Sequence, residues 1–193
     1  STYLPFPDPL SLSSNDGTVL TLSCSDGKWS YKKGEAVVST RFNGTVKMAD
    51  GASPSTNKLI IDTATDNPTL TFEQVVINST GGAALTINKD CALTLNTTGD
   101  NTSTLSSSGA STLVNNGSLT LTGKGLYIGN TGDNNEYYGL NNSGTFTVTN
   151  PSSTSVTFHC ANIAIHNTGT LDNAWMEWLS LIHISEPTRP ISI

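Results

Sequence analysis

Acidic residues recur in a repeated loop context that could bind a metal ion. Residues 98–101 and 131–134 are both Thr-Gly-Asp-Asn, 33 positions apart, and residues 65–67 are Thr-Asp-Asn. Ca²⁺ prefers oxygen ligands, so Asp66, Asp100 and Asp133 are candidate ligands if they stack at the corners of a coiled fold. Asp and Asn in such loops also form Asx turns, and one carboxylate per coil is a small ligand set. Calcium and plain turns therefore both remain open, and no other cofactor is expected.

Residues for cleaving an acidic polysaccharide are sparse. Such an enzyme needs calcium-binding carboxylates with an Arg or Lys base, or a pair of acids a few ångströms apart. Arg41 is the only arginine before residue 179, and the polygalacturonase motifs Asn-Thr-Asp, Asp-Asp, Gly-His-Gly and Arg-Ile-Lys are absent. His159 and His166 have no acidic residue within three positions, which favours wall or turn roles. We therefore expect no catalytic residues.

Tyr137 and Tyr138 form an aromatic pair inside a long insertion, residues 129–139. Aromatic faces stack on sugar rings, and loops often carry function, so the pair is a candidate carbohydrate contact. The alternative is that both rings pack the loop against the rest of the protein. Either role requires a framework that holds the loop in place.

A repeat of about 26 residues predicts that framework. Leu93, Leu119, Phe146 and Leu171 each lead a short alternating segment, and they are 26, 27 and 25 residues apart. A second set runs through Leu59, Leu85, Leu113, Leu140 and Ile163, and a third through Ile77, Leu105, Ile128 and Phe158. Three short strands per repeat, each stacked on its counterpart in the next, predict an all-β, right-handed parallel β-helix (β-solenoid) with about 26 residues per coil. An antiparallel sandwich is the alternative, but it predicts no such period.

Turn residues separate the expected strands, and helical periodicity is missing. Residues 115–117 (Asn-Asn-Gly) and 142–144 (Asn-Ser-Gly) are predicted turns whose residues tolerate positive φ. No stretch of ten residues shows the 3.6-residue period of a helix, so helix content should be very low.

Alternation also predicts a flat outer face rich in threonine. If Leu119 and Leu121 point inward, their neighbours point outward and stack on equivalent residues of adjacent coils. The expected rows are Ala92, Ser118, Thr145 and Thr170; Thr94, Thr120, Thr147 and Asp172; and Asn96, Thr122 and Thr149. The candidate ligand-binding threonines are Thr94, Thr120, Thr122, Thr147 and Thr149. Strand propensity alone, a polysaccharide platform and an ice-binding array all fit this pattern.

Composition and charge argue against some classes of binding partner. The net charge of −6 and the pI near 4.8 argue against nucleic acid, which needs clustered Lys and Arg. No run of about 20 apolar residues exists, so no transmembrane segment is expected. The three cysteines, Cys24, Cys91 and Cys160, lie in different parts of the pattern and are interpreted as buried small hydrophobic residues.

The repeat resembles a known fold family. Residues 117–121 (Gly-Ser-Leu-Thr-Leu) and 144–148 (Gly-Thr-Phe-Thr-Val) look like the repeats of pectate-lyase-like β-helices in bacterial surface proteins, including adhesin and carbohydrate-binding families. The resemblance covers about residues 17–178 and implies a fold rather than an activity. It implies a secreted or cell-surface protein whose partner is a polysaccharide or a host surface.

The two ends of the chain fall outside the repeat. Residues 1–16 are a Pro-rich lead-in, in which Pro5, Pro7 and Pro9 exclude a helix and a central strand. Residues 179–193 resemble a translated sequencing-library adapter, so we expect the native β-helix, residues 17–178, to be truncated at its C-terminal end.

These features favour a non-catalytic extracellular or cell-surface β-helix that binds carbohydrate or mediates adhesion, and that is monomeric. A fragment of a β-helix polysaccharide lyase or glycoside hydrolase is the second hypothesis. An ice-binding Thr-rich solenoid is the third.

Overall fold

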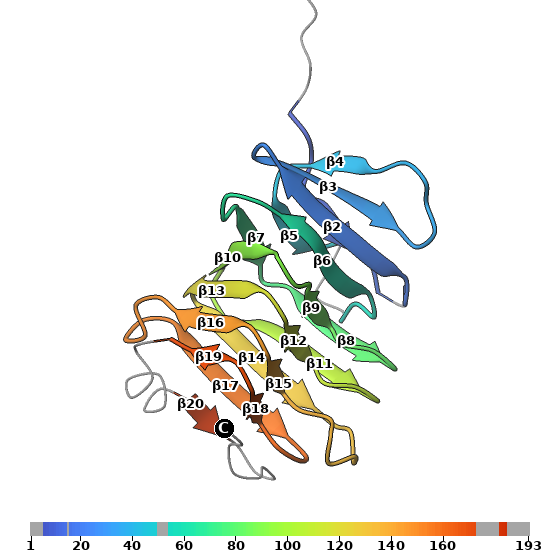
Figure 1. Ribbon diagram of the computed structural model, residues 1–193. Helices are drawn as coiled ribbons and strands as arrows, with labels where there is room; N and C mark the ends of the chain where they lie inside the picture. Colours follow the sequence, from blue (N-terminus) through green and yellow to red (C-terminus); the bar gives the residue numbers. More distant parts are fainter. Residues whose placement is uncertain (1–5, 15, 50–53, 173–181, 185–193) are drawn as a thin grey trace, which may run out of the picture.

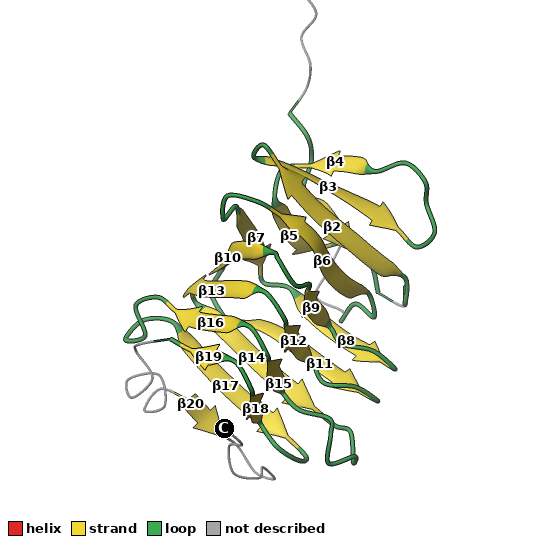
Figure 2. Cartoon of the chain, viewed as in Figure 1, coloured by secondary structure: helices red, strands yellow, loops and turns green. Residues whose placement is uncertain are grey.

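Short strands in the computed structural model stack on one another one coil apart, as the repeat predicts. The structure describes residues 6–14, 16–49, 54–172 and 182–184. Within these residues the protein is all-β with no helix, and it forms a parallel β-solenoid of about five turns with a coil spacing of about 27 residues. The turns run along one axis, from the N-terminal strands to the C-terminal ones (Figures 1 and 2).

Three sheets line the solenoid. Sheet A has the order β1 (Leu10–Leu12), β5 (Thr45–Met48), β7 (Thr69–Glu73), β10 (Ala92–Thr98), β13 (Ser118–Gly123), β16 (Thr145–Val148) and β19 (Thr170–Leu171). Sheet B has the order β8 (Val76–Thr80), β11 (Ser103–Ser108), β14 (Gly125–Asn130), β17 (Ser155–Cys160) and β20 (Ile182–Ile184). Sheet C has the order β4 (Thr40–Phe42), β3 (Lys28–Lys33), β2 (Val19–Ser25), β6 (Lys58–Ala64), β9 (Leu85–Ile87), β12 (Leu113–Asn115), β15 (Leu140–Asn142) and β18 (Ile165–Asn167). Each regular coil passes from sheet C to sheet A to sheet B.

The strand register confirms the predicted apolar stacks. In sheet A, Leu93 pairs with Leu119, Leu119 with Phe146, and Phe146 with Leu171. In sheet B, the third set pairs in the predicted order, from Ile77 to Phe158. A strand of three to seven residues buries its apolar face because each neighbouring coil lies about 4.8 Å away.

One member of the second stack was predicted wrongly. Leu140 pairs with Ile165 rather than with Ile163, while the other three pairs of that stack are as predicted. Ile163 is half-buried and lies before β18, whereas Ile165 is fully buried. The two residues are two positions apart, so alternation places both on the same side and cannot choose between them.

The turns that contain Gly117 and Gly144 require glycine because of close packing between coils, not because of the positive φ that the sequence suggests. Gly117 and Gly144 are not among the residues with positive φ. A Cβ on Gly144 would instead overlap the carbonyl oxygen of Gly117, and a Cβ on Gly169 would overlap that of Gly144. These three glycines form a column one coil apart in which only a hydrogen atom fits between successive turns.

Asparagine side chains form a hydrogen-bonded ladder inside the solenoid. Asn115 Nδ2 donates to Asn142 Oδ1 at 2.8 Å, and Asn142 Nδ2 donates to Asn167 Oδ1 at 2.7 Å. Asn142 Nδ2 also lies 3.1 Å from the Thr170 carbonyl oxygen, so the ladder joins the turn backbone as well. Asn115 and Asn142 have no exposed surface, and the ladder satisfies groups that burial would otherwise leave unpaired.

The N-terminal end departs from parallel pairing. Strands β2, β3 and β4 pair antiparallel and extend sheet C beyond the first regular coil (Figure 1). Trp29 and Phe42 are buried with ring centroids 5.9 Å apart, and Trp29 Nε1 donates to the Thr69 carbonyl oxygen at 3.0 Å. These rings cover the first turns of the core, as terminal caps do in other repeat folds.

Part of the Pro-rich lead-in belongs to the fold. Leu10 and Leu12 are buried in β1, the edge strand of sheet A, which pairs parallel with β5. Proline is tolerated next to such an edge because no further strand needs its missing N–H group. At the other end, β20 pairs with β17, although its residues belong to the adapter-like segment 179–193. The rest of that segment and Trp178, the last residue before it, lie outside the described part of the chain.

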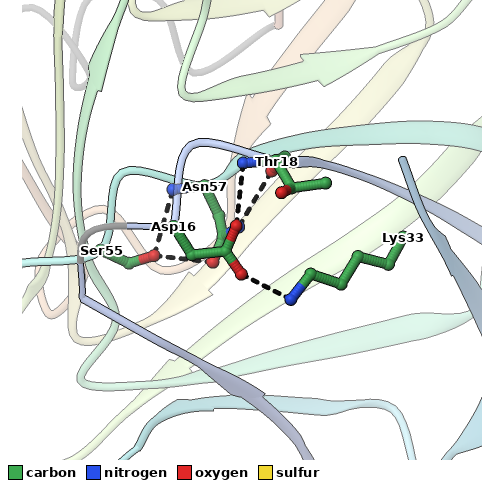
Figure 3. Close-up of polar contacts among 5 residues, drawn as sticks. All are labelled: Asp16, Thr18, Lys33, Ser55 and Asn57. Carbon is green, nitrogen blue, oxygen red and sulfur yellow. Dashed lines mark hydrogen bonds and ion pairs between the residues drawn. The ribbon is translucent and has the colours of Figure 1, made fainter. Parts of the chain in front are cut away.

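Polar contacts join the end of the lead-in to β3 and the start of β2 to the segment before β6. Asp16 Oδ2 lies 2.6 Å from Lys33 Nζ, and Asp16 Oδ1 accepts a hydrogen bond from the Thr18 backbone N–H at 3.1 Å (Figure 3). Asn57 Nδ2 donates to the Thr18 carbonyl oxygen at 2.9 Å, and Ser55 Oγ donates to Asn57 Oδ1 at 2.8 Å. The bond to Lys33 and those to Thr18 lower the pKa of Asp16 from 3.8 to about 2.

Candidate functional site

The outer face of sheet A carries the predicted threonine rows. Thr94 pairs with Thr120, and Thr120 with Thr147. The row continues by one strand beyond the prediction, because Thr69 pairs with Thr94. Thr94, Thr120 and Thr147 are half-buried, so their side chains stand on the sheet rather than inside the core.

The neighbouring row follows the same register. Thr45 pairs with Thr71, Thr71 with Asn96, and Asn96 with Thr122. Thr149, which the sequence places next in this row, is exposed and directly follows β16. With strands about 4.8 Å apart and outward residues about 6.6 Å apart along each strand, the two rows form a regular array of hydroxyl and methyl groups.

Hydrogen bonding differs between the edges and the centre of this array. Thr147 Oγ1 donates to Asp172 Oδ2 at 2.7 Å, and Asn67 Nδ2 donates to Thr94 Oγ1 at 3.2 Å. Within the described chain, the hydroxyl groups of Thr120 and Thr122 make no hydrogen bond to another protein group. The centre of the face therefore offers donors and acceptors to an external partner.

The centre of the face is also uncharged. The outward residues of β10, β13 and β16 are Ala, Ser, Thr and Asn only. Charged side chains lie at its borders, where Lys47 pairs with Glu73 in register and Asp172 follows β19. We call the outer surface formed by Thr94, Asn96, Thr120, Thr122, Thr145 and Thr147 the threonine face, with Thr120 and Thr122 at its centre.

The tyrosine pair packs against the solenoid. The Tyr138 ring stacks on His166 with centroids 4.6 Å apart and an angle of 13° between the planes. The Tyr137 ring lies against Gly132, where a Cβ would come within 2.6 Å of it. Both tyrosines are half-buried, and each has one ring face engaged within the protein. This packing fits the structural role of the pair better than a free stacking platform.

The three candidate calcium ligands lie in three different types of connection. Asp66 is between sheets C and A, Asp100 is between sheets A and B, and Asp133 is between sheets B and C. Because these connections lie at different corners of the coil, the three residues do not form a single stack, and all three are exposed. Asp66 has φ of 64°, a left-handed turn conformation that Asp tolerates better than most residues. No group of three or more His, Cys, Asp or Glu side chains suited to a metal occurs among the described residues.

The cysteines are free and buried, as predicted. Burial raises the pKa of the Cys160 thiol to about 12, and burial also raises the pKa of Cys24 and Cys91. A thiol with a raised pKa is a poor nucleophile at neutral pH, so these residues act as core side chains.

The sequence did not indicate a cavity at the N-terminal end. It has a volume of about 800 Å³ and lies between the lead-in and the β3–β4 hairpin, with Phe6, Asp8, Tyr31, Arg41 and Phe42 among its lining residues. These residues are up to 36 positions apart in the sequence and share no repeat, so only the folded hairpin brings them together.

The described chain contains no helix that could cross a membrane. Comparisons with models of known families, with curated proteins and with solved structures found no match.

Proposed function

We propose that this protein is a non-catalytic, extracellular or cell-surface β-solenoid that binds an extended polysaccharide through the threonine face. The observation that carries the proposal is the uncharged array centred on Thr120 and Thr122, whose hydroxyl groups have no partner within the described protein. Each threonine presents both a hydroxyl and a methyl group. A sugar ring likewise presents hydroxyl groups at its edge and C–H groups on its faces.

Avidity along the rows would compensate for weak individual contacts. A net hydrogen bond contributes only about 1 kcal/mol, so a single threonine cannot hold a sugar. Four strands in register repeat the same contact every 4.8 Å or so along the solenoid axis, and a linked chain of sugars can engage several at once. A flat face therefore suits a long or crystalline glycan better than a monosaccharide.

Retention on insoluble polysaccharides tests this proposal. The purified chain should be retained on at least one of cellulose, chitin and xylan, and prolonged incubation should release neither reducing ends nor unsaturated products. Retention with product release would favour the lyase or hydrolase hypothesis, and no retention on any of them would contradict polysaccharide binding.

Ice is the second candidate ligand, because the Thr69–Thr94–Thr120–Thr147 row is one strand longer than the sequence analysis expected. Ala92, Ser118 and Asn96 interrupt the adjoining rows, which favours polysaccharide over an ice lattice. Inhibition of ice recrystallisation at micromolar protein concentration, without retention on polysaccharide, would reverse that order.

A further inference from the structure

We propose that the cavity at the N-terminal end, named here the hairpin pocket, binds a single neutral sugar unit such as the end of a glycan. The pocket has a volume of about 800 Å³, within the range of roughly 300–1,000 Å³ that is usual for small-ligand sites. None of its lining residues belongs to the threonine face, so this inference does not depend on the function proposed for that face.

Aromatic side chains line the pocket. The Tyr31 and Phe42 rings meet edge to face with centroids 5.8 Å apart, and Phe42 is only 2% exposed. Phe6, by contrast, is 87% exposed, so its ring is open to a ligand. Exposed aromatic rings pack on the C–H faces of a pyranose, so Tyr31 and Phe6 are the rings that a sugar could contact, while Phe42 supports Tyr31 from below the surface.

Two opposite charges in the pocket are not paired with each other. Asp8 and Arg41 both line it, yet the one salt bridge within the described residues joins Lys33 and Asp16. The Arg41 guanidinium can donate hydrogen bonds and the Asp8 carboxylate can accept them. A sugar hydroxyl does both, so a neutral polyol can satisfy the two groups together.

The same pair disfavours charged ligands. An acidic ligand would approach the Asp8 carboxylate as well as Arg41, and a cationic ligand would approach Arg41 as well as Asp8. A pocket group that carries the same charge as the ligand repels the ligand and reduces its affinity. The presence of both charges in one pocket therefore favours a net-neutral, polyhydroxylated ligand over a uronate or an amine.

Hydrogen bonds hold the pocket walls in place before a ligand arrives. Arg41 Nε donates to the Trp29 carbonyl oxygen at 3.2 Å, which fixes the stem of the guanidinium group. The Asn43 backbone N–H donates to the Asp8 carbonyl oxygen at 3.0 Å and joins the lead-in to the segment after β4. Walls that are already positioned lose less conformational entropy on binding.

An NMR titration of the full ¹⁵N-labelled chain tests the proposal with cellobiose, maltose and lactose as probes. At least one disaccharide should shift the Arg41 Nε–H signal and the Asn43 amide signal saturably, with Kd on the order of 1 mM. Asp8→Asn, which keeps the shape of the side chain, should weaken that binding about 10-fold. Arg41→Gln should weaken it similarly if its melting temperature matches that of the parent protein.

Several results would overturn the assignment. They are a lack of saturable shifts with all three disaccharides, affinity that is unchanged in Asp8→Asn, or tighter binding of galacturonate than of the neutral probes. Thr120→Lys is the matched control on the threonine face and should leave disaccharide binding unchanged. A loss of polysaccharide retention in that variant, with intact disaccharide binding, would show that the two sites act separately.

Discussion

Replacing Asn142 with alanine should destabilise the solenoid more than replacing the outward-facing residue of the same strand. The Asn142 side chain accepts a hydrogen bond from Asn115 and shares its two Nδ2 hydrogens among Asn167 Oδ1 and the carbonyl oxygens of Gly144 and Thr170, and it has no exposed surface. At about 1 kcal/mol for each net hydrogen bond, less some recovery by water at the half-exposed Asn167, the loss should be roughly 3 kcal/mol. The alanine also leaves a small void beside buried groups, which adds to the cost.

The neighbouring residue supplies a matched control. Asn141 is in the same strand but points outward, and no hydrogen bond of its side chain occurs within the described structure. Asn141→Ala should therefore change the unfolding free energy by less than about 0.5 kcal/mol.

Urea unfolding followed by circular dichroism would measure both variants. Hydrogen exchange at the backbone amides of Leu140 and Thr145 would show whether the loss is local, as repeat folds allow. A loss below about 1 kcal/mol in Asn142→Ala, or equal effects at the two positions, would refute the idea that the ladder stabilises the turns.

Three further predictions follow from individual contacts. In thermal unfolding, Gly144→Ala should cost about 2 kcal/mol or more, because its Cβ would overlap the Gly117 carbonyl oxygen. Gly81→Ala should cost about 1 kcal/mol, because no atom lies within 4 Å of its Cβ but φ is +75°. Ile165→Ala should lose about 3 kcal/mol and Ile163→Ala less than half of that, and similar losses would show that the register assigned to β18 is incorrect. The Asp16–Lys33 bond should stabilise the protein by only about 1 kcal/mol above pH 4, because Lys33 is 55% exposed and the pair is partly screened by solvent. This contribution should be lost as the pH falls toward 2, because the pKa of Asp16 in the folded protein is lowered to about 2. Asp16→Asn should remove that pH-dependent difference, and an unchanged pH profile would argue against the bond.

The repeat made much of the fold predictable from the sequence. Inward residues such as Leu93 and Leu119 recur at nearly constant spacing, and a parallel solenoid is the arrangement that brings them into register. Ile163 was misplaced because a shift of two residues preserves the inward side of a strand. The antiparallel β2–β3–β4 segment could not be foreseen from the period, since it occurs once among the described residues and has no counterpart in the other described coils.

The candidate sites could be predicted from the sequence less completely than the fold. The threonine rows follow directly from alternation and register, so Thr120 and Thr147 were placed correctly. The sequence analysis interprets Asn115 and Asn142 as turn residues, whereas the structure places them in the buried ladder. Their separation of 27 positions equals that of the inward residues Leu113 and Leu140, and this equality is the signal that could have indicated inward side chains. The hairpin pocket depends on contacts between the lead-in and a non-repeating hairpin, for which the sequence offers no periodic indication.

Retention of a matched pair of double variants on polysaccharide would test the central claim most directly. Thr120→Lys with Thr122→Lys places two charges at the centre of the threonine face, while Thr104→Lys with Ser106→Lys places the same charges, at the same spacing, on the outer face of β11 in sheet B. All four residues are half-buried and outward, so both double variants should stay within about 1 kcal/mol of the parent stability. We predict that the sheet A variant loses retention on the polysaccharide that holds the parent protein and that the sheet B variant keeps it. Equal retention of both variants would contradict the assignment of the threonine face as the binding surface.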